Sequence, residues 1–517
     1  MTLENTKTLR DLIANSAAEY GSKEYILEKD GEGVKSLSFS DFYSNAKHIC
    51  GFVNSKKTGD TVHAAVIGPT SSEYIESYFG TVIGGNVIVP VDAQLSPDDI
   101  CDLLNRSDSE IFFFDARFAP IIPLVKAKCP EVKSFVSFTE CEAADTNIKN
   151  IIETYPAEEK SDIAPNSLAS IIYTSGTTGK SKGVMLSHGN LIDNVFCRNN
   201  ESSPKDTVLS VLPIHHVYCL TCDVLLSIRY GATLAINDSL MRIAKNLKLF
   251  KPTIMLLVPM IAETILKQIK AASAAKPEIP AALIAKDVFG GRLETIYSGG
   301  AYLNPSIIED YRKLGITVLQ GYGMTECSPR ISSAVQENVG RDDHVGTVVD
   351  RCEVKTVDGE LWVKSPSVMQ GYYKDPENTA ETITPDGWLK TGDLGYVDEK
   401  NCVFITGRKK NLIILSNGEN VSPEELENKF SGVPFAEDVL VYTDEAVITA
   451  EVYPGKEALT TLSRGDIEAK LKALVEDINK TVSPAKAIRR IRLRETEFDK
   501  TTSKKIRRNQ PSHGEII

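Results

Sequence analysis

Short apolar runs rich in β-branched residues alternate with segments of helical spacing along most of this chain. HAAVIG (63–68), NVIVPV (86–91) and EIFFFD (110–115) are such runs, and SPDDICDLLNRS (96–107) has the period of an amphipathic helix. Strands and helices that alternate in this way form an α/β domain with a mainly parallel sheet, because a parallel neighbour is reached through a crossover helix. The pattern therefore predicts an α/β fold.

The same rhythm returns after a polar stretch from Glu140 to Asn166, which we interpret as a surface connection. The strand-like run SLASIIYTS (167–175) follows it, and later runs again alternate with helical segments, which predicts a second α/β layer. From about Gly346 the strands become shorter, as in CEVKTVDGELWVKS (352–365), and indicate a small β-rich subdomain. The later runs are TIMLLVP (253–259), LETIYSG (293–299) and ITVLQGYG (316–323).

The C-terminal part has the pattern of a small α+β domain. A basic turn, RKKN (408–411), precedes SPEELENKF (422–430), whose Ser, Pro and acids mark a helix start. A strand-like segment at 439–454 and a helical one at 464–482 follow. With 517 residues the chain has room for several domains. We expect a large N-terminal domain over 1–409 and a small domain over 410–517.

Charge and cysteine usage exclude several classes of protein. The formal net charge of −12 argues against nucleic acid as a partner, although residues 484–508 carry ten Lys or Arg and only three acids. Ten cysteines are scattered through a chain that is long enough to fold around a hydrophobic core without disulfide bonds. The first residues lack the apolar core of a signal peptide, and no apolar stretch is long enough to span a membrane. A soluble, cytoplasmic protein is expected.

The densest cluster of small polar residues is YTSGTTGKSKGVMLSHGN, residues 173–190, directly after a predicted strand. Ser, Thr and Gly in this density expose backbone N–H groups and hydroxyls in a concave nest, and Lys180 and Lys182 add positive charge for a phosphate chain. A Walker loop needs a Gly five residues before Gly179, where this chain has Thr174, so a P-loop ATPase or kinase is excluded. A solvated turn is the alternative for a single loop of this kind.

With this loop the chain resembles the adenylate-forming superfamily of acyl-CoA synthetases, luciferases and peptide-synthetase adenylation domains. The superfamily's phosphate loop begins with either Tyr or Phe, continues with TSG and then either Ser or Thr, and ends with TGxPKG. The chain matches this pattern except for Ser181 in place of Pro. Four more motifs follow in the family's order. The resemblance implies that ATP phosphates are bound by Thr174, Ser175, Gly176, Thr177, Thr178, Gly179 and Lys180.

Two motifs resemble the adenine and metal-binding parts of the family. In GYGMTE (321–326) the resemblance implies that Tyr322 stacks on adenine and that its neighbours Gly321 and Gly323 belong to the same nucleotide site. It also implies that Thr325 contacts phosphates and that Glu326 holds Mg²⁺. A single carboxylate suits Mg²⁺, which takes its other ligands from phosphate and water. Taken alone, a Thr-Glu pair after a Gly turn is more often a helix cap. The preceding SGGA implies a second adenine wall made by Gly299, Gly300 and Ala301.

Two further motifs concern the ribose and the hinge. In GWLKTGDLGYVDE (387–399) the resemblance assigns Asp393 to the ribose hydroxyls, although a lone Asp in such a turn is usually a turn former. In TGRKKNLIILSNGENVSPEELE (406–427) it assigns Arg408 to the ribose, Lys410 to the hinge of a rotating C-terminal lid, and Gly418 to the thiol's approach.

The last motif is FDKTTSKKIRR (498–508). It resembles a family pattern that begins with Pro, continues with either Lys or Arg and then TxxGK, and ends with either Ile or Leu, any residue and Arg. Alignment on the terminal Arg508 assigns the catalytic lysine to Lys505, with Lys504 where Gly is usual and Asp499 where Pro is usual. Because of these departures, Lys500 and Lys504 remain alternatives. A solvated basic tail is the plain interpretation of such a run by itself.

The run VLPIHHVYCL (211–220) resembles the family's LPxxHxxG segment and implies that His216 lies beside the acyl pocket, with His215 as the competing candidate. Family members that activate amino acids have an Asp that aligns with Tyr218, so an amino acid substrate is disfavoured unless Asp223 takes that role. Cys219 and Cys222 lack a second cysteine pair and are interpreted as core residues.

The resemblance predicts an AMP-forming acid–thiol ligase. A fatty or aryl carboxylate attacks the α-phosphorus of ATP, pyrophosphate leaves, and the acyl group of the acyl-AMP passes to CoA. The segment QGYYKDPENTAETI (370–383) makes the chain most like a fatty-acyl-CoA synthetase. The alternatives are an adenylation enzyme that loads a separate carrier protein and, because of the altered lysine motif, a non-catalytic adenylate-binding sensor.

Overall fold

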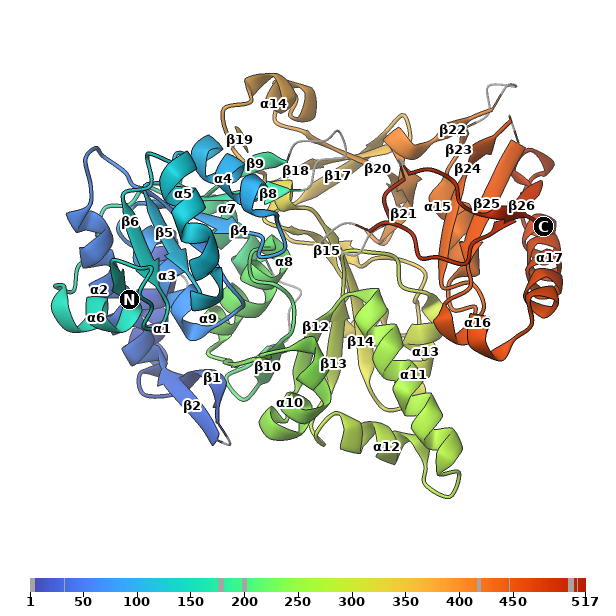
Figure 1. Ribbon diagram of the computed structural model, residues 1–517, viewed down its shortest axis with the longest axis horizontal. Helices are drawn as coiled ribbons and strands as arrows, with labels where there is room; N and C mark the ends of the chain where they lie inside the picture. Colours follow the sequence, from blue (N-terminus) through green and yellow to red (C-terminus); the bar gives the residue numbers. More distant parts are fainter. Residues whose placement is uncertain are drawn as a thin grey trace. The chain divides into compact units, whose positions relative to one another are not determined.

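The computed structural model describes residues 5–31, 33–174, 181–197, 202–415, 420–445, 447–500, 506–508 and 510–517. The chain divides into two compact units (Figure 1). The first unit comprises Met1–Ala301, Glu309–Glu353 and Val363–Leu389, and the second comprises Tyr302–Ile308, Val354–Trp362 and Lys390–Ile517. Both units mix helices with sheets, which confirms the predicted α/β class.

An eight-stranded sheet forms one layer of the first unit. Its central strands pair in parallel, whereas β8, β9 and β19 pair antiparallel at one edge. Strands β4 and β5 are buried at every residue, as expected of strands covered on both faces. The order is β19 (Gly371–Tyr372), β9 (Lys182–Ser187), β8 (Leu168–Thr174), β4 (Val87–Val91), β3 (His63–Ile67), β5 (Ile111–Phe114), β6 (Ser134–Ser137) and β7 (Thr146–Asn147).

Helices that follow these strands cover the sheet. In α4 (Pro97–Arg106) the Ser96 side chain accepts the Asp99 N–H, Pro97 occupies the first turn, and Ile100, Cys101, Leu103 and Leu104 are buried against the sheet. The other helices of this layer are α1 (Leu9–Tyr20), α2 (Phe39–Ser55), α3 (Ser72–Val82), α5 (Ile122–Lys128) and α6 (Ile148–Thr154).

A nine-stranded sheet forms the second layer of the same unit. The predicted strands at 253–259, 293–299 and 316–323 are confirmed and lie side by side. The sequence did not predict that an N-terminal hairpin, β1–β2, joins this sheet beside β11. The order is β16 (Thr347–Val348), β15 (Arg330–Ser333), β14 (Thr317–Gly323), β13 (Thr295–Ser298), β12 (Ile254–Leu257), β10 (Thr207–Ser210), β11 (Thr233–Ile236), β1 (Glu24–Asp30) and β2 (Gly33–Ser38).

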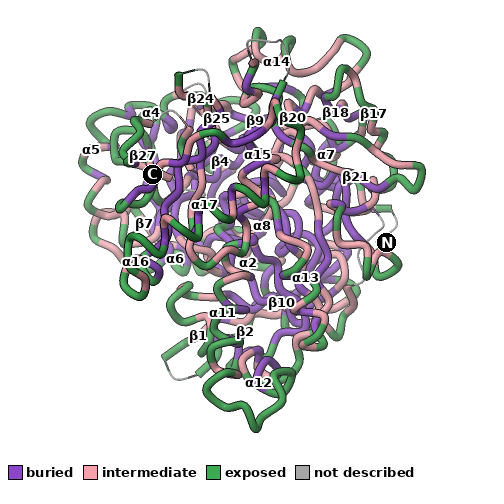
Figure 2. The backbone as a smooth tube through the Cα atoms, turned by 90° about the vertical axis from the view of Figure 1, so that its right-hand side faces the viewer, coloured by how far each residue is buried: buried purple, intermediate pink, exposed green. Residues whose placement is uncertain are grey.

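Figure 2 shows the contrast between buried strands and the exposed outer sides of helices such as α12. The other helices between residues 188 and 382 are α7 (His188–Phe196), α8 (Val217–Cys219), α9 (Leu226–Tyr230), α10 (Ile243–Phe250), α11 (Pro259–Ala275), α12 (Ala281–Val288), α13 (Pro305–Lys313) and α14 (Pro376–Thr382), with a π-helical segment, η3 (Leu220–Leu225), between α8 and α9. Of these, α7 contacts β9 and α14 contacts β19, both in the eight-stranded sheet. Among the described residues, no helix is both long and apolar enough to cross a membrane.

The expectation for residues 140–166 was wrong. The segment is not only a surface connection, because it contains edge strand β7 and helix α6, which packs against α2. Ile148 and Ile151 of α6 are buried, so this stretch contributes apolar residues at helical spacing to the core.

The second unit has the predicted small sheets and a helical layer. A four-stranded sheet comprises β17 (Glu353–Val357), β18 (Glu360–Lys364), β20 (Leu389–Val397) and β21 (Val403–Arg408). Towards the C-terminus, a second four-stranded sheet packs its apolar face against α15 and α17. That sheet comprises β24 (Asp438–Asp444), β25 (Val447–Tyr453), β26 (Arg490–Leu493) and β27 (Glu515–Ile516). The same part of the chain contains a two-stranded sheet of β22 (Ile413–Ile414) and β23 (Asn420–Val421), and the helices α15 (Pro423–Glu427), α16 (Lys456–Thr461) and α17 (Arg464–Lys480).

Candidate functional site

The carboxyl ends of β13 and β14 bring two of the predicted motifs together. Ser298 and Gln320 are register partners in this parallel pair, so Gly299, which follows β13, lies beside Gly321 within β14. A Cβ on Gly299 would lie 3.2 Å from the Gly321 carbonyl oxygen and 3.3 Å from the Tyr218 ring. Gly300 has φ +82°, a conformation that glycine adopts without strain, and Ala301 is exposed. The absence of a side chain at Gly299 lets Gly321 and Tyr218 approach it closely.

The turn after β14 depends on another close approach. A Cβ on Gly323 would lie 2.1 Å from the carbonyl oxygen of Pro329, so only glycine fits there. Tyr322 precedes this glycine, and Thr325 and Glu326 open the short helix η5 (Thr325–Cys327). All three side chains are half-buried.

A buried asparagine holds this turn in place. Asn194 of α7 donates from Nδ2 to the carbonyl oxygens of Cys327 and Arg330, both at 3.0 Å. Its Oδ1 accepts the Arg330 N–H at 3.2 Å. Because α7 follows β9, the residues after the glycine-rich segment support the turn that carries Glu326.

Glu326 is connected to the glycine-rich segment through Tyr372, a residue that the sequence analysis did not select. The Tyr372 hydroxyl donates to Glu326 Oε1 at 2.8 Å, and Lys182 Nζ lies 4.9 Å from the centre of the Tyr372 ring. Burial, and then the negative charge of Glu326, raise the pKa of Tyr372, so the phenol stays protonated and donates. Strand β19 places Tyr372 opposite Val184 of β9.

The surroundings of Glu326 fit a magnesium ion bound mainly through phosphate. Its second carboxylate oxygen, Oε2, has no hydrogen-bond partner among the described residues. Over the same residues no three His, Cys, Asp or Glu side chains form a metal-binding group. A one-carboxylate site is what Mg²⁺ uses beside a nucleotide, so the residues present fit this ion better than a metal held by protein ligands alone.

Thr174 and Lys182 are register partners at the end of the antiparallel pair β8–β9. The glycine-rich segment therefore connects two strands, which differs from the strand–helix connection of a Walker loop. Ser175, Gly176, Thr177, Thr178, Gly179 and Lys180, together with Gly418 and Lys505, lie outside the described residues.

The two histidines of the LPxxH-like segment stand with ring centres 4.2 Å apart. His215 is buried, and its Nε2 lies 3.5 Å from Asp92 Oδ1. Burial and the neighbouring His216 lower the pKa of His215 despite Asp92, so His215 is neutral. His216 is half-buried at the start of α8.

Asp223 is fully buried in the π-helical segment η3. Its Oδ2 accepts from Ser210 Oγ at 2.8 Å, and Cys219 Sγ lies 3.5 Å from the same oxygen. Burial raises the pKa of Asp223 to about 7. Cys219 and Cys222 are buried, as predicted for core residues.

In the second unit Asp393 and Arg408 form an ion pair. They are register partners in the antiparallel pair β20–β21, and Arg408 Nε lies 2.8 Å from Asp393 Oδ1. The Asp393 side chain is 4% exposed and that of Arg408 45%. Lys410 is exposed in the turn that follows.

Glu360 of β18 is a second buried acid that the sequence analysis missed. Its Oε1 accepts the Gly392 N–H and its Oε2 binds Lys409 Nζ, both at 2.9 Å. Burial opposes its charge, but these two partners hold the pKa of Glu360 below the ordinary value. Glu360 thereby ties the TGD turn to the basic turn at the expected hinge.

Two residues of the motif at 498–508, Lys500 and Arg508, form ion pairs. Lys500 Nζ lies 2.7 Å from Asp438, and Arg508 binds Glu427 at 2.6 Å and Glu424 at 3.1 Å. Lys500 and Ile506 form an isolated antiparallel bridge. Of the alternative catalytic lysines, Lys500 is thus engaged with a carboxylate of its own unit, whereas Lys504 lies outside the described residues.

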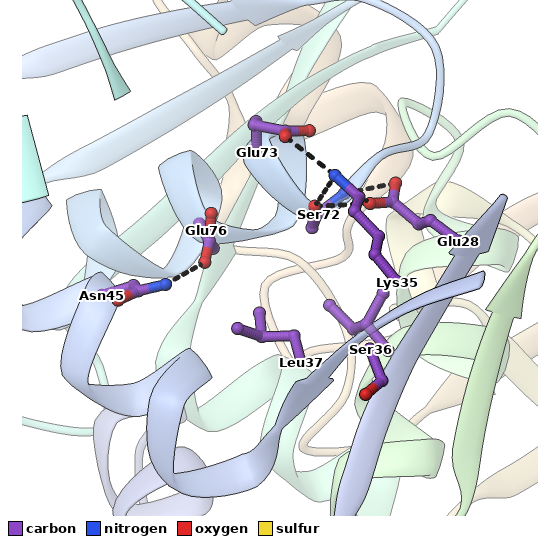
Figure 3. A pocket seen from close by; sticks show the side chains of 9 residues that line it. Glu28, Lys35, Ser36, Leu37, Asn45, Ser72, Glu73 and Glu76 are labelled. Atoms are coloured by element: carbon purple, nitrogen blue, oxygen red, sulfur yellow. Dashed lines mark hydrogen bonds and ion pairs between the residues drawn. The ribbon is translucent and has the colours of Figure 1, made fainter. Parts of the chain in front are cut away.

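A cavity of ≈ 200 Å³ in the first unit is lined by none of the predicted site residues (Figure 3). Lys35 from β2 binds Glu28 at 2.8 Å and Glu73 at 3.2 Å, and Asn45 donates to Glu76 at 2.7 Å. Burial, and to a smaller extent Glu73 and Glu28, raise the pKa of Glu76 to about 8. These acids have hydrogen-bond or ion-pair partners within the fold.

Comparison with known proteins gives consistent matches over nearly the whole chain. A family model described as AMP-binding enzyme matches residues 13–373, and one described as AMP-binding enzyme C-terminal domain matches residues 410–513. Long chain acyl-CoA synthetase 7, peroxisomal, of Arabidopsis thaliana is 30% identical over 421 residues, which are 69% of this chain and 59% of that protein. The chain thus spans less than two thirds of that relative's length.

A second relative is matched over most of its length. 4-Coumarate–CoA ligase 1 of Arabidopsis thaliana is 27% identical over 491 residues, covering 87% of this chain and 83% of that protein. Among solved structures, the anthranilate CoA ligase AuaEII in complex with anthranoyl-AMP superposes with a TM-score of 0.84 over 98% of both chains. At 19% sequence identity this likeness shows the fold.

Proposed function

The chain belongs to the AMP-binding enzyme family, and on that premise we propose that it is an ATP-dependent acid–thiol ligase that makes acyl-CoA through an acyl-AMP intermediate. The observation that carries the proposal is the connection of Glu326 through Tyr372 to Lys182, which joins two family motifs in one polar site. The relatives' names, acyl-CoA synthetase and CoA ligase, agree with this activity.

The proposed reaction begins with in-line attack of the substrate carboxylate on the α-phosphorus of ATP. Pyrophosphate leaves, and the mixed anhydride acyl-AMP forms. A thiolate then attacks the acyl carbon, AMP leaves, and a thioester remains. Negative charge builds on the transferring phosphate and the leaving group, so the protein must supply cations and hydrogen-bond donors rather than a strong base.

Each part of the site has a proposed role in that reaction. Tyr322 and the Gly299–Ala301 backbone bind adenine, Asp393 and Arg408 orient the ribose, and segment 174–180 binds the β- and γ-phosphates. Thr325 contacts the phosphates, and Glu326 would hold Mg²⁺, which would offset phosphate charge when bound. Lys505 bridges the carboxylate and the α-phosphate, and His216 lies beside the acyl group.

The domain division also belongs to the proposal. We place the boundary near Lys410, with Lys505 on a C-terminal lid over 410–517 that rotates about a short polar turn between the half-reactions. The match of a C-terminal domain model to residues 410–513 supports this placement. Rotation of such a lid needs changes in only a few backbone dihedrals, which a short polar turn can accommodate.

The substrate is an aliphatic or aryl acid rather than an amino acid. Tyr218 carries no charge for an α-ammonium group, and the Asp223 carboxylate is directed to Ser210 and Cys219 within the core. We place the enzyme in the cytoplasm and in fatty acid metabolism. All ten cysteines lie among the described residues and all are free thiols, which suits a reducing compartment.

Two measurements test the proposal. Pyrophosphate exchange into ATP is measured with straight-chain acids of increasing length and with benzoic and cinnamic acids, and exchange that depends on one of these acids is expected. Thioester formation is then compared between CoA and a phosphopantetheinylated carrier protein, with CoA expected as the better acceptor. Product on the carrier protein alone would favour the carrier-loading enzyme, and an absence of exchange with every acid would favour the adenylate-binding sensor.

A further inference from the structure

We propose that Arg106 is a positioning residue for the proposed ATP site, which it serves by fixing both flanks of the glycine-rich segment. The inference rests on the proposed function, because the role of that segment in phosphate binding comes from it. Arg106 belongs to none of the motifs that carry the family resemblance. It is the last residue of α4, about 70 positions before the segment.

The first flank is Ser181, which directly follows the segment. Arg106 NH1 donates to the Ser181 carbonyl oxygen at 2.8 Å, and NH2 donates to Ser181 Oγ at 3.0 Å. The remaining donor, Nε, binds Asp102 Oδ2 at 2.8 Å one helical turn earlier. The guanidinium group is thus bound to its own helix through Asp102 and donates two hydrogen bonds to Ser181. Two bonds from one planar group fix the orientation of Ser181 as well as its distance from α4.

The second flank is Tyr173, directly before Thr174. The guanidinium carbon of Arg106 lies 5.0 Å from the centre of the Tyr173 ring, within cation–π range. Tyr173 is the register partner of Gly183, and a Cβ on Gly183 would lie 3.1 Å from Tyr173 Cζ. The ring therefore packs onto β9 while it contacts Arg106, so one side chain touches the residues on both sides of the segment.

The end of α4 is itself held against the same strand. Asp108, two residues after Arg106, accepts from the Tyr373 hydroxyl and from Lys374 Nζ, both at 2.6 Å. The Tyr373 N–H donates to the Gly183 carbonyl oxygen at 2.8 Å. Arg106 consequently projects from a base that is fixed relative to β9, as a positioning residue requires.

The identity of residue 181 explains why this chain needs such a residue. The family signature that this chain resembles has Pro at this position, and the proline ring by itself fixes φ near −65°. Serine supplies no such restraint, and its hydroxyl is one of the two atoms that Arg106 binds. The structure assigns to Arg106 the restraint that proline supplies through its ring.

The test is a double-mutant cycle with Arg106→Gln and Ser181→Pro. ATP affinity is measured by calorimetry in the presence of Mg²⁺ and without acid, and each variant's melting temperature is recorded. Arg106→Lys keeps the charge but lacks the fork. Arg117→Gln is the matched control, because Arg117 also pairs with a nearby Asp, at 2.8 Å, but touches neither flank.

Arg106→Gln and Arg106→Lys should each weaken ATP binding about tenfold with little change in melting temperature, because the pair of charge-assisted hydrogen bonds to Ser181 is lost. In the Ser181→Pro background Arg106→Gln should change the affinity less than about twofold. Arg117→Gln should leave it unchanged. If Arg106→Gln fails to fold, Ser181→Ala, which removes only the gripped hydroxyl, should still weaken binding about threefold.

An equal loss in both backgrounds would overturn the proposal, as would unchanged ATP affinity in Arg106→Gln or, if that variant fails to fold, in Ser181→Ala. Failure of the proposed function gives a different result. A wild type that binds ATP but catalyses no acid-dependent exchange would contradict the ligase, while the affinities of the variants would still decide the role of Arg106.

Discussion

Replacement of Gly323 by alanine should damage the proposed adenine and metal-binding turn, whereas the same change at Gly321 should be tolerated. The added Cβ at 323 would lie 2.1 Å from Pro329 O and 2.8 Å from Pro329 C. Both atoms belong to the backbone, so no side chain can rotate away. At 321 the nearest atom, Ser332 O, is 3.4 Å away, an ordinary contact.

The cost follows from that geometry. The chain around Pro329 must retreat by about 1 Å to reach the shortest contacts that real Cβ atoms make, and overpacking of this kind costs about 1–3 kcal/mol. The strain falls on β14 and β15, whose pairing ends at Gly323 and Arg330. Tyr322 and Thr325 lie on either side of it, so a displacement in catalytic geometry should accompany the loss of stability.

Chemical denaturation and acid-dependent pyrophosphate exchange measure the two effects. We expect Gly323→Ala to unfold at lower denaturant concentration and to lose exchange activity by about 10²-fold or more. Gly321→Ala should unfold at close to the wild-type denaturant concentration, because its Cβ would make only an ordinary contact. If the two variants behave alike, the close approach of Gly323 to Pro329 does not shape the site.

Three further predictions concern single side chains. Tyr372→Phe keeps the ring beside Lys182 but removes the hydroxyl bound to Glu326, so exchange should fall about tenfold and require more Mg²⁺; an unchanged Mg²⁺ response would refute this. In the wild type the folded Glu76 keeps its proton up to a pKa of about 8, whereas the unfolded carboxyl loses it near 4.5, so stability should fall as pH rises between these values, by up to about 1.4 kcal/mol per pH unit. Glu76→Gln should remove that slope from a series of melting curves, and parallel curves for the two proteins would contradict the assignment. Lys505→Ala should abolish exchange while Lys500→Ala, whose lysine is paired with Asp438, should retain it, and the opposite result would move the catalytic role to Lys500.

Several central strands of the two large sheets could be predicted because burial on two faces leaves an unbroken apolar run. The runs at 63–68, 86–91 and 110–115 became β3, β4 and β5 with ends shifted by one residue or less. The helix expected over 96–107 from its apolar spacing became α4 (Pro97–Arg106). These elements are specified by their own residues, so no knowledge of their neighbours was needed.

The place of the β1–β2 hairpin could not be predicted in the same way. Ile26 pairs with Leu234, about two hundred residues later, and neither segment's sequence indicates that the two strands pair. The polar contacts of the site have the same limitation. Tyr372, Glu360 and Arg106 are ordinary surface-compatible residues in the sequence, and only the fold places them against Glu326, Gly392 and Ser181.

The formation of an acyl-AMP is the central claim, and the fate of the carboxylate oxygen tests it most directly. The enzyme is incubated with ATP, CoA, Mg²⁺ and an acid that supports exchange, its carboxylate labelled with oxygen-18, and the products are analysed by mass spectrometry. Attack of the carboxylate on the α-phosphorus predicts one labelled oxygen in AMP for each thioester formed. Label in inorganic phosphate, or thioester with unlabelled AMP, would contradict the adenylate mechanism.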